Sequence, residues 1–470
     1  MADASAPRKR IRPRKFVGST KAPLSSSSSS TPPLNSIPQS LLQNEALNAA
    51  ISALPSNYSF EIHKTLAHIQ RHGSTMVALQ LPEGLQMYAC AIADIIESFS
   101  DALTVVLADV TYGACCVDDY TAKALGCDLL VHYGHSCLVP VDITTGIRTL
   151  YVFVEIAIDE KHLVETVRLN LPDTKERFLE SLGEERAIGE AITSGLKQHL
   201  AIAHDGEDKE SKEESSVGPP TSLALVSTIQ FVSALSRLKE TLSSPLLNSS
   251  SPNLWPGPYA ATVPRSHPLS PGEILGCTAP RLPDAPDAFI YLGDGRFHLE
   301  AAMIANPGVP AFRYDPYSKK LTREGYDHVR MRDTRLKAVK NAEGKGTWGV
   351  ISGTLGRQGN PGHLKAISSL TLSGNQTSSV TPIPILLSEL SPAKLALFKD
   401  SIDVFVQTSC PRLSIDWGAA FEKPLLSVYE SGVVLGKWGG WWEDGEYPMD
   451  FYARGSRWVE ARKNGEFITA

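Results

Sequence analysis

Short β-branched apolar runs alternate with helical stretches along most of the chain, a pattern typical of α/β units around a parallel sheet. Three times such a run enters a polar or glycine-bearing loop and then a helical pattern, at residues 77–84, 223–231 and 350–359. Each start precedes two further predicted strands, at 103–110 and 129–133, at 273–276 and 288–292, and at 381–387 and 403–407. The pattern predicts an α/β protein of three similar domains, each a small, mostly parallel sheet flanked by helices, converging on a central site.

Three segments break this pattern and have compositions that do not favour a packed core. Residues 1–40 hold a basic run, six consecutive serines and two prolines, and are predicted to form a disordered tail. The acidic segment 205–220 and the Ser-, Pro- and Asn-rich segment 243–271 are predicted to be surface insertions. The expected domains are therefore residues 41–158, 159–305 (with both insertions) and 306–470.

The composition excludes several classes of protein. With 470 residues, 42% of them hydrophobic and 20% charged, the chain resembles an ordinary globular protein of two or three domains. It contains no apolar run of the roughly 18 residues needed to cross a bilayer, and no apolar segment follows its basic N-terminus as a secretory signal requires. We therefore expect a cytoplasmic protein that does not enter a membrane and whose seven cysteines are reduced.

Charge is distributed unevenly along the chain. The first 21 residues hold seven basic residues and one acid, so the remaining 449 carry −12 against −6 overall. Such a body repels phosphate, and we expect no nucleic-acid partner. The basic tail is interpreted as a solvated extension, with a nuclear address or an acidic partner as alternatives. A C-terminal aromatic group is interpreted as domain packing or a protein interface: Trp417, Trp438, Trp441, Trp442, Tyr447, Phe451 and Tyr452.

Three cysteines carry the candidate chemistry. Cys115, Cys277 and Cys410 each lie in a predicted strand-end loop, one in each unit. Loops after the carboxyl ends of parallel strands meet at one edge of a sheet, so three units around a common point could bring these sulfurs together. Three thiolates without a clear fourth suit an iron–sulfur cluster with one iron open to substrate. The alternative is a small buried hydrophobe, which we favour for Cys90 and Cys127.

Another potential metal motif is the sequence HYGHSC, which contains His132, His135 and Cys137. Positions three apart on a strand face opposite sides, so both imidazoles reach one zinc ion only if a turn follows Tyr133. We favour hydrogen-bonded loop histidines over zinc ligands here.

Eight segments, in order along the chain, carry a family resemblance: LQLPEGL, DVTYGACCVDDYTAKALGCDLLVHYGHSCLVPVD, GCTAPRL, YLGDGRFHLEA, YDPYSKKLTREGYD, SGTLGRQGN, TSCPRLSIDWG and YPMDFY. Together they resemble the diphthamide synthase family from Val77 to Tyr452, apart from the two insertions. The three loop cysteines are all within them. The resemblance implies an unusual radical enzyme that uses S-adenosylmethionine and a 4Fe-4S cluster held by Cys115, Cys277 and Cys410, with Cys116 not a ligand.

The resemblance also implies the reaction and its partners. In this family a 3-amino-3-carboxypropyl group passes from S-adenosylmethionine to a histidine imidazole of elongation factor 2, in the first step of diphthamide biosynthesis. It implies a heterodimer with a companion subunit and a small metal-binding electron donor with its own reductase. The alternative within the family is a non-catalytic structural or electron-relay subunit. The complete cysteine set favours the catalytic role.

Two strand-end loops supply candidate contacts to S-adenosylmethionine. In LGDGRFH they are Gly293, Asp294, Gly295 and His298, and in SGTLGRQG they are Ser352, Gly353, Thr354, Arg357 and Gln358. Glycine permits close approach of the backbone to a ligand, and Arg357 could pair with the methionine carboxylate. A tight turn with a helix cap is the alternative for the first loop. Strict threefold equivalence is not expected, because the loop after the second strand of the third unit offers Ser388 and Glu389 in place of a cysteine.

Overall fold

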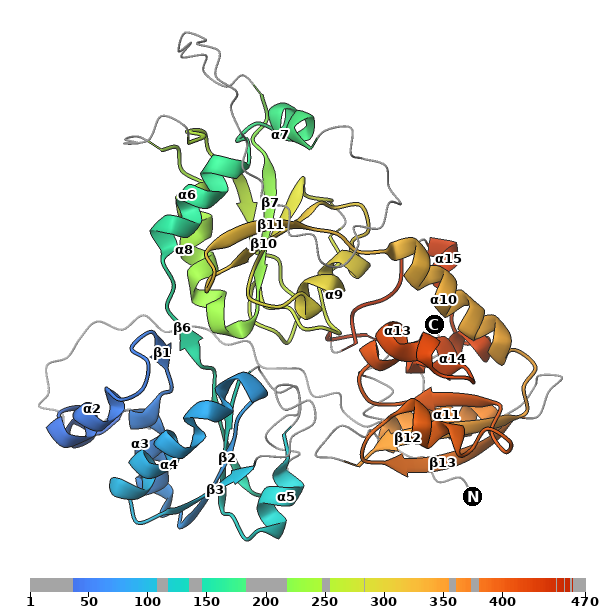
Figure 1. The fold of residues 1–470 in the computed structure, drawn as a ribbon, viewed down its shortest axis with the longest axis horizontal. Helices are drawn as coiled ribbons and strands as arrows, with labels where there is room; N and C mark the ends of the chain where they lie inside the picture. The colour runs from blue at the N-terminus through green and yellow to red at the C-terminus, as the bar shows by residue number, and fades with distance from the viewer. Residues whose placement is uncertain are drawn as a thin grey trace, which may run out of the picture.

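The computed structural model describes residues 37–107, 117–134, 146–182, 218–246, 254–282, 284–354, 361–372, 380–444, 446–451, 453–456 and 459. Three mostly parallel sheets lie in three lobes, coloured from blue to red along the chain in Figure 1. The sheet orders are β3-β2-β4-β5, β11-β10-β9-β7-β8 and β13-β12-β14-β15. In each sheet the first strand of the unit lies between the second and the third. The predicted fold of three similar α/β units is therefore confirmed.

The first unit contains the sheet nearest the N-terminus, with β1 and β6 forming a separate antiparallel pair. Its central strands β2 and β4 are almost wholly buried, whereas the edge strand β3 is partly exposed. The strands are β1 (Tyr58–Ser59), β2 (Met76–Gln80), β3 (Leu103–Leu107), β4 (Leu129–Tyr133), β5 (Arg148–Val152) and β6 (Glu155–Ile156). The helices are α1 (Gln39–Leu42), α2 (Glu45–Ile51), α3 (Ile62–His72), η1 (Glu83–Tyr88), α4 (Ala89–Ser98) and α5 (Asp119–Ala124).

The second unit adds an antiparallel edge strand to a parallel sheet. Its strands are β7 (Ser222–Ser227), β8 (Ala260–Thr262), β9 (Ala288–Leu292), β10 (Ala311–Asp315) and β11 (Lys320–Glu324). Its helices are α6 (Glu160–Asn170), α7 (Lys175–Ser181), η3 (Ile229–Phe231), α8 (Val232–Leu242) and α9 (Phe297–Ala305). All five residues of β9 are buried, as expected for a central parallel strand covered on both faces.

The third unit has a fully parallel sheet. Its strands are β12 (Thr347–Gly353), β13 (Thr381–Leu387), β14 (Val404–Gln407) and β15 (Leu425–Leu426). Its helices are α10 (His328–Ala342), α11 (Pro361–Leu372), α12 (Pro392–Ala396), α13 (Arg412–Trp417), η4 (Gly418–Ala420), α14 (Val428–Val434) and α15 (Trp441–Asp444). The long helix α10 leads from the second unit into the third, as Figure 1 shows.

Two predictions for the second unit are wrong. Residues 273–276 form no strand and make only isolated bridges, at Glu273 and Leu275. The edge strand is β8, which lies inside the segment 243–271 expected to be a surface insertion. Its central residue Ala261 and the preceding Tyr259 are buried. A three-residue strand is too short to show a recognisable pattern in its own sequence. Its pairing with β7 is what defines it as a strand.

The second sheet also extends past the expected domain boundary at residue 305. Strand β10 pairs with β9, and β11 pairs with β10, so residues 311–324 belong to the second sheet. The sequence 311–324 forms a hairpin that completes this sheet. Residues 205–217 of the predicted acidic insertion 205–220, and the basic residues of the tail, lie outside the described residues.

The second and third units share one hydrophobic core. A single cluster of buried side chains includes Phe289 and Met303 from the second unit together with Trp348 and Val404 from the third. The main cluster of the first unit is separate and made of its own residues. The contact between the second and third units is therefore part of the folded core, and side chains at that contact are held rigidly. None of the described helices is both long and apolar enough to span a bilayer.

Candidate metal centre

Cys277 lies in a loop that is packed from two sides. Its side chain is 6% exposed, and the hydroxyl of Thr278 lies 3.8 Å from its sulfur. Gly276 faces the ring of Phe297, and a Cβ atom at this glycine would come within 2.0 Å of a ring carbon. On the other side, the backbone N–H of Phe451 donates to the Cys277 carbonyl at 3.2 Å. The loop is thus fixed by the second unit and by the C-terminal segment of the third.

Cys410 lies in the loop between β14 and α13. The buried side chain of Gln407 orients this loop, since its amide nitrogen donates to the Cys410 carbonyl at 2.9 Å and to the Ser414 hydroxyl at 3.0 Å. Burial raises the pKa of the Cys410 thiol, and the backbone N–H groups of Arg412 and Leu413 oppose that shift. A sulfur in this position carries negative charge most readily when a cation replaces its proton, as in a metal thiolate.

Arg412 joins the loops of the two cysteines. Its Nη1 donates to the carbonyl of Phe297 at 2.7 Å and, in a longer contact of 3.4 Å, to the carbonyl of Gly276. Its Nη2 pairs with Glu300 of α9 at 2.5 Å, and its Nε lies 2.9 Å from both carboxylate oxygens of Asp416. The guanidinium carbon lies 4.4 Å from the ring centre of Phe297. One side chain therefore connects the residue before Cys277 with the helix that follows Cys410.

The LGDGRFH loop reaches the same junction. It connects β9 to α9, and it ends at Phe297, whose carbonyl Arg412 binds. Gly293 leaves room for the Tyr291 hydroxyl, which would lie 2.6 Å from a Cβ atom there. The side chain of Asp294 is exposed, and the His298 ring lies 5.5 Å from the ring of Phe297. Gly295 is also exposed and would accept a Cβ atom without contact.

The SGT segment at the end of β12 lies beside the loop of Cys410. Thr408, two residues before Cys410, donates from both its N–H and its hydroxyl to the carbonyl of Ile351. Ser352 is buried, Gly353 ends the strand, and Thr354 donates from its N–H to the Leu387 carbonyl at 2.9 Å. This contact places the segment 352–354 next to the residues that lead to Cys410.

Several predicted site residues lie outside the described residues: Cys115, His135, Cys137, Arg357 and Gln358. Within the described part of the chain, no three His, Cys, Asp or Glu side chains gather closely enough to hold a metal ion. The structure thus describes two of the three predicted ligand sulfurs, in loops that are joined to each other. His132 is buried on β4 with its ring 5.7 Å from that of Tyr151.

The sequence did not predict four residues that the structure places beside the cysteine loops: Arg412, Glu300, Phe297 and Gln407. The Arg412–Asp416 pair has the spacing of an ordinary helical ion pair. Nothing local to it indicates the partners in the second unit, which are 112 and 136 residues away in the sequence.

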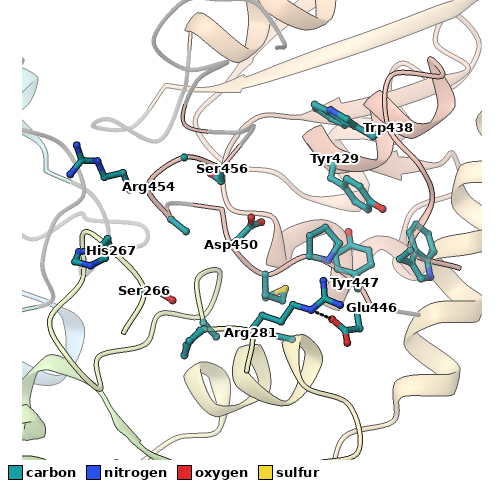
Figure 2. A pocket seen from close by; sticks show the side chains of 18 of the residues that line it. Ser266, His267, Arg281, Tyr429, Trp438, Glu446, Tyr447, Asp450, Arg454 and Ser456 are labelled. Carbon is teal, nitrogen blue, oxygen red and sulfur yellow. Dashed lines mark ion pairs between the residues drawn. The ribbon is translucent and has the colours of Figure 1, made fainter. Parts of the chain in front are cut away.

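A pocket of about 630 Å³ lies beside the Cys277 loop and is drawn in Figure 2. Ala279 and Pro280 of that loop line it. The aromatic rings of Tyr429, Trp438 and Tyr447, labelled in Figure 2, also line it. No predicted cluster or S-adenosylmethionine contact among the described residues lines this pocket. The buried rings in its wall belong to the shared core, which supports packing as their role.

A family model for diphthamide synthesis proteins matches residues 81–186 and 196–448. The chain belongs to the diphthamide synthesis family. Among curated members, 2-(3-amino-3-carboxypropyl)histidine synthase subunit 1 of Gallus gallus is 49% identical over 417 residues, which are 89% of this chain and 86% of that protein. The protein of the same description from Homo sapiens is 48% identical over 423 residues, 90% of this chain and 81% of the relative.

Two solved structures have a similar fold. Dph2 from Pyrococcus horikoshii matches with a TM-score of 0.57 at 22% identity, covering 83% of this chain and 93% of Dph2. A structure of that archaeal protein with a 4Fe-4S cluster matches with the same TM-score and identity, over 85% of this chain and 95% of the other. At this level of identity the likeness establishes the shared fold.

Proposed function

We propose that this chain is the cluster-binding catalytic subunit of an enzyme that transfers a 3-amino-3-carboxypropyl group from S-adenosylmethionine to a histidine imidazole of elongation factor 2. This is the first step of diphthamide biosynthesis. The names of the relatives support the transferase activity, since they are 48–49% identical to this chain over about nine-tenths of its length. The cluster in the archaeal Dph2 structure supports the cofactor.

The observation that carries the proposal is the link between the loops of Cys277 and Cys410. These cysteines come from different units, yet Arg412 binds the backbone beside one and begins the helix after the other. The donor set fits an iron–sulfur cluster, because hydrogen bonds hold the carbonyls of both cysteines. Burial raises the pKa of the Cys410 thiol, against the backbone N–H groups of Arg412 and Leu413, so a bound metal ion would favour its thiolate. Cys115, Cys277 and Cys410 would hold a 4Fe-4S cluster, which when bound supplies the electron that cleaves the sulfonium.

The remaining role of the chain is to place S-adenosylmethionine. Which carbon–sulfur bond breaks depends on which carbon the pocket holds toward the open iron, so specificity is a matter of orientation. The exposed residues Asp294 and Gly295 lie in the loop that ends at Phe297, whose carbonyl Arg412 binds. The segment 352–354 follows Ile351, whose carbonyl accepts from Thr408. We assign both segments to this placement. Gly293, His298, Arg357 and Gln358 complete the proposed set of contacts.

The proposal includes partners and a location. A companion subunit is part of it, because the relatives are described as subunit 1. Elongation factor 2 is the protein substrate, and a small metal-binding protein with a reductase supplies electrons. The reaction takes place in the cytoplasm, where free thiols stay reduced. Each of the three units contributes one cysteine, and the second unit extends through its sheet to residue 324 and not only to 305.

Replacing each cysteine in turn tests the proposal. The chain is purified without oxygen together with its companion subunit, as native protein and as Cys115→Ala, Cys277→Ala and Cys410→Ala. We expect each variant to lose cluster iron, the paramagnetic resonance signal of the reduced cluster and transfer to elongation factor 2. Cys127→Ala is the matched control, since Cys127 is buried in a separate cluster of the first unit.

Each result has a defined meaning. Native iron content in a variant removes that cysteine from the ligand set. Loss of iron with full transfer supports the non-catalytic alternative, in which the companion subunit performs the chemistry. Absence of iron from the native complex overturns the proposal.

A further inference from the structure

We infer that Arg412 is a positioning residue that holds the loops of Cys277 and Cys410 in a fixed relative position. The inference rests on the proposed function for its purpose, which is to present two sulfurs to one cluster. It concerns a side chain outside the predicted ligand and cofactor contacts. It also explains how cysteines from two units keep one geometry.

The contacts of Arg412 divide between the two units. On its own helix the guanidinium binds Asp416, and in the second unit it binds the carbonyls of Gly276 and Phe297 and the carboxylate of Glu300. The side chain of Arg412 is 3% exposed, whereas those of Glu300 and Asp416 are 22% and 27% exposed. A buried guanidinium that loses its hydrogen-bond partners is left without water to replace them, so these contacts strongly resist separation.

The geometry requires arginine at this position. The planar fork sends Nε to one carboxylate, Nη2 to another and Nη1 to two carbonyls, while its face covers the ring of Phe297. A lysine ammonium keeps the charge but cannot reach these groups together or stack on the ring. If Arg412 acted through its charge alone, Arg412→Lys would keep the loops in their native position. If Arg412 acts by linking the loops, Arg412→Lys should release them.

The matched control is Arg335, which is also buried in the third unit. Arg335 is 0% exposed and pairs with Glu430, and its contacts stay within that unit. Arg335→Lys therefore removes the fork of a buried arginine without touching either cysteine loop. Any effect of Arg412→Lys beyond that of Arg335→Lys reports on the link between the loops.

The first test uses the complete iron-free chain with its companion subunit. Alkylation of Cys277 and Cys410 by iodoacetamide is followed by mass spectrometry, with buried Cys127 as the internal reference. We expect Arg412→Lys and Arg412→Gln to raise the labelling rate of Cys277 by about tenfold or more, because the loop opens more often. Arg335→Lys leaves the ratio of Cys277 to Cys127 labelling at its native value.

A second variant approaches the link from the other unit. Glu300→Gln removes the carboxylate that Arg412 binds on α9, so it should also raise Cys277 labelling. Combined with Arg412→Gln it should add little, because both changes break the same contact. This variant keeps the test decisive if Arg412→Gln does not fold. Additive effects of the two substitutions would contradict the link.

The third measurement uses the protein reconstituted with iron and sulfide. Release of iron to a chelator should be about tenfold faster in Arg412→Lys than in Arg335→Lys, because thiol ligands leave more readily from loose loops. Native rates of both labelling and iron release in Arg412→Lys overturn the inference and leave the proposed function standing. Faster labelling in a complex that never binds iron supports the link between the loops and overturns the proposed function.

Discussion

Two buried arginines of the third unit have opposite roles. Arg335 places two nitrogens 2.7 Å from the two carboxylate oxygens of Glu430 and a third contact on the Leu425 carbonyl, so it ties α10 to α14 inside one unit. Arg412 divides its contacts between its own helix and Glu300 of the second unit. The same side chain thus closes a core in one place and joins two units in the other. The two arginines differ because the hydrogen-bond partners of Arg335 lie in one unit and those of Arg412 lie in two.

The Glu430 site is more completely enclosed than the junction. Its carboxylate also accepts from the Tyr447 hydroxyl at 3.0 Å and the Ser427 N–H at 2.8 Å. Ser427 and Glu430 form a capping box at the start of α14. Arg335 and Glu430 both have 0% exposed side chains, so disruption of this pair leaves a charge without water. Its contribution is therefore to stability, whereas that of Arg412 is to the relative position of two loops.

The largest expected effect is on stability, at Glu430. Glu430→Gln leaves the Arg335 guanidinium buried without its counter-charge, and we expect a loss of about 3–5 kcal/mol in the free energy of unfolding. Urea unfolding of the iron-free chain measures it. The double variant Arg335→Met with Glu430→Met removes both charges and should regain most of the loss. A loss below about 1 kcal/mol in the single variant would show that this pair is not closed to water.

Substitution of two glycines tests the same difference between the junction and the enclosed core, and its expected effect is intermediate in size. Gly276 faces the Phe297 ring at the junction, and Gly432 on α14 faces the Trp438 indole, where a Cβ atom would come within 2.1 Å of ring carbons. Gly276→Ala and Gly432→Ala should each lower the free energy of unfolding by about 1–3 kcal/mol through overpacking. We expect iron content to fall in Gly276→Ala, because the Cys277 loop is displaced. Gly432→Ala should keep native iron content.

The control for the glycine pair is temperature. Iron content is measured well below the melting temperature of both variants, so that loss of fold does not contribute. Equal iron loss in the two variants would mean that general destabilisation, and not the position of the loop, controls cluster retention.

The elements that a sequence pattern can predict are those defined by their own residues. The central strands at 129–133 and 288–292 and the edge strand at 381–387 lie where apolar runs place them. Strand β8 and the hairpin of β10 and β11 were missed because a short strand is defined by its neighbour. The same reason applies to Arg412. Its residue type and its spacing to Asp416 indicate a surface ion pair, and only folding brings Glu300 to it.

The smallest expected effect is a pH dependence of the free energy of unfolding. It arises at the start of α10. His328 begins α10, the helix that carries Arg335, with its ring 5.1 Å from that of Tyr326. Burial, aided by Arg332, lowers the pKa of His328 from 6.5 to about 4, and Asp327 opposes the shift only weakly. Between these two pKa values, His328 is therefore protonated in the unfolded chain and neutral in the folded chain. The stability from neutral His328 is complete above pH 6.5 and is lost as the pH falls toward 4.

Replacing His328 with glutamine isolates this contribution. Between pH 7 and pH 4.5, the free energy of unfolding should fall by about 1 kcal/mol more in the native chain than in His328→Gln. This value is reduced because the ring is partly exposed to solvent. Urea unfolding at several pH values measures the difference between the two slopes. Parallel slopes in the two proteins would mean that His328 is protonated in the folded chain as readily as in the unfolded one, and that the start of α10 is open to water.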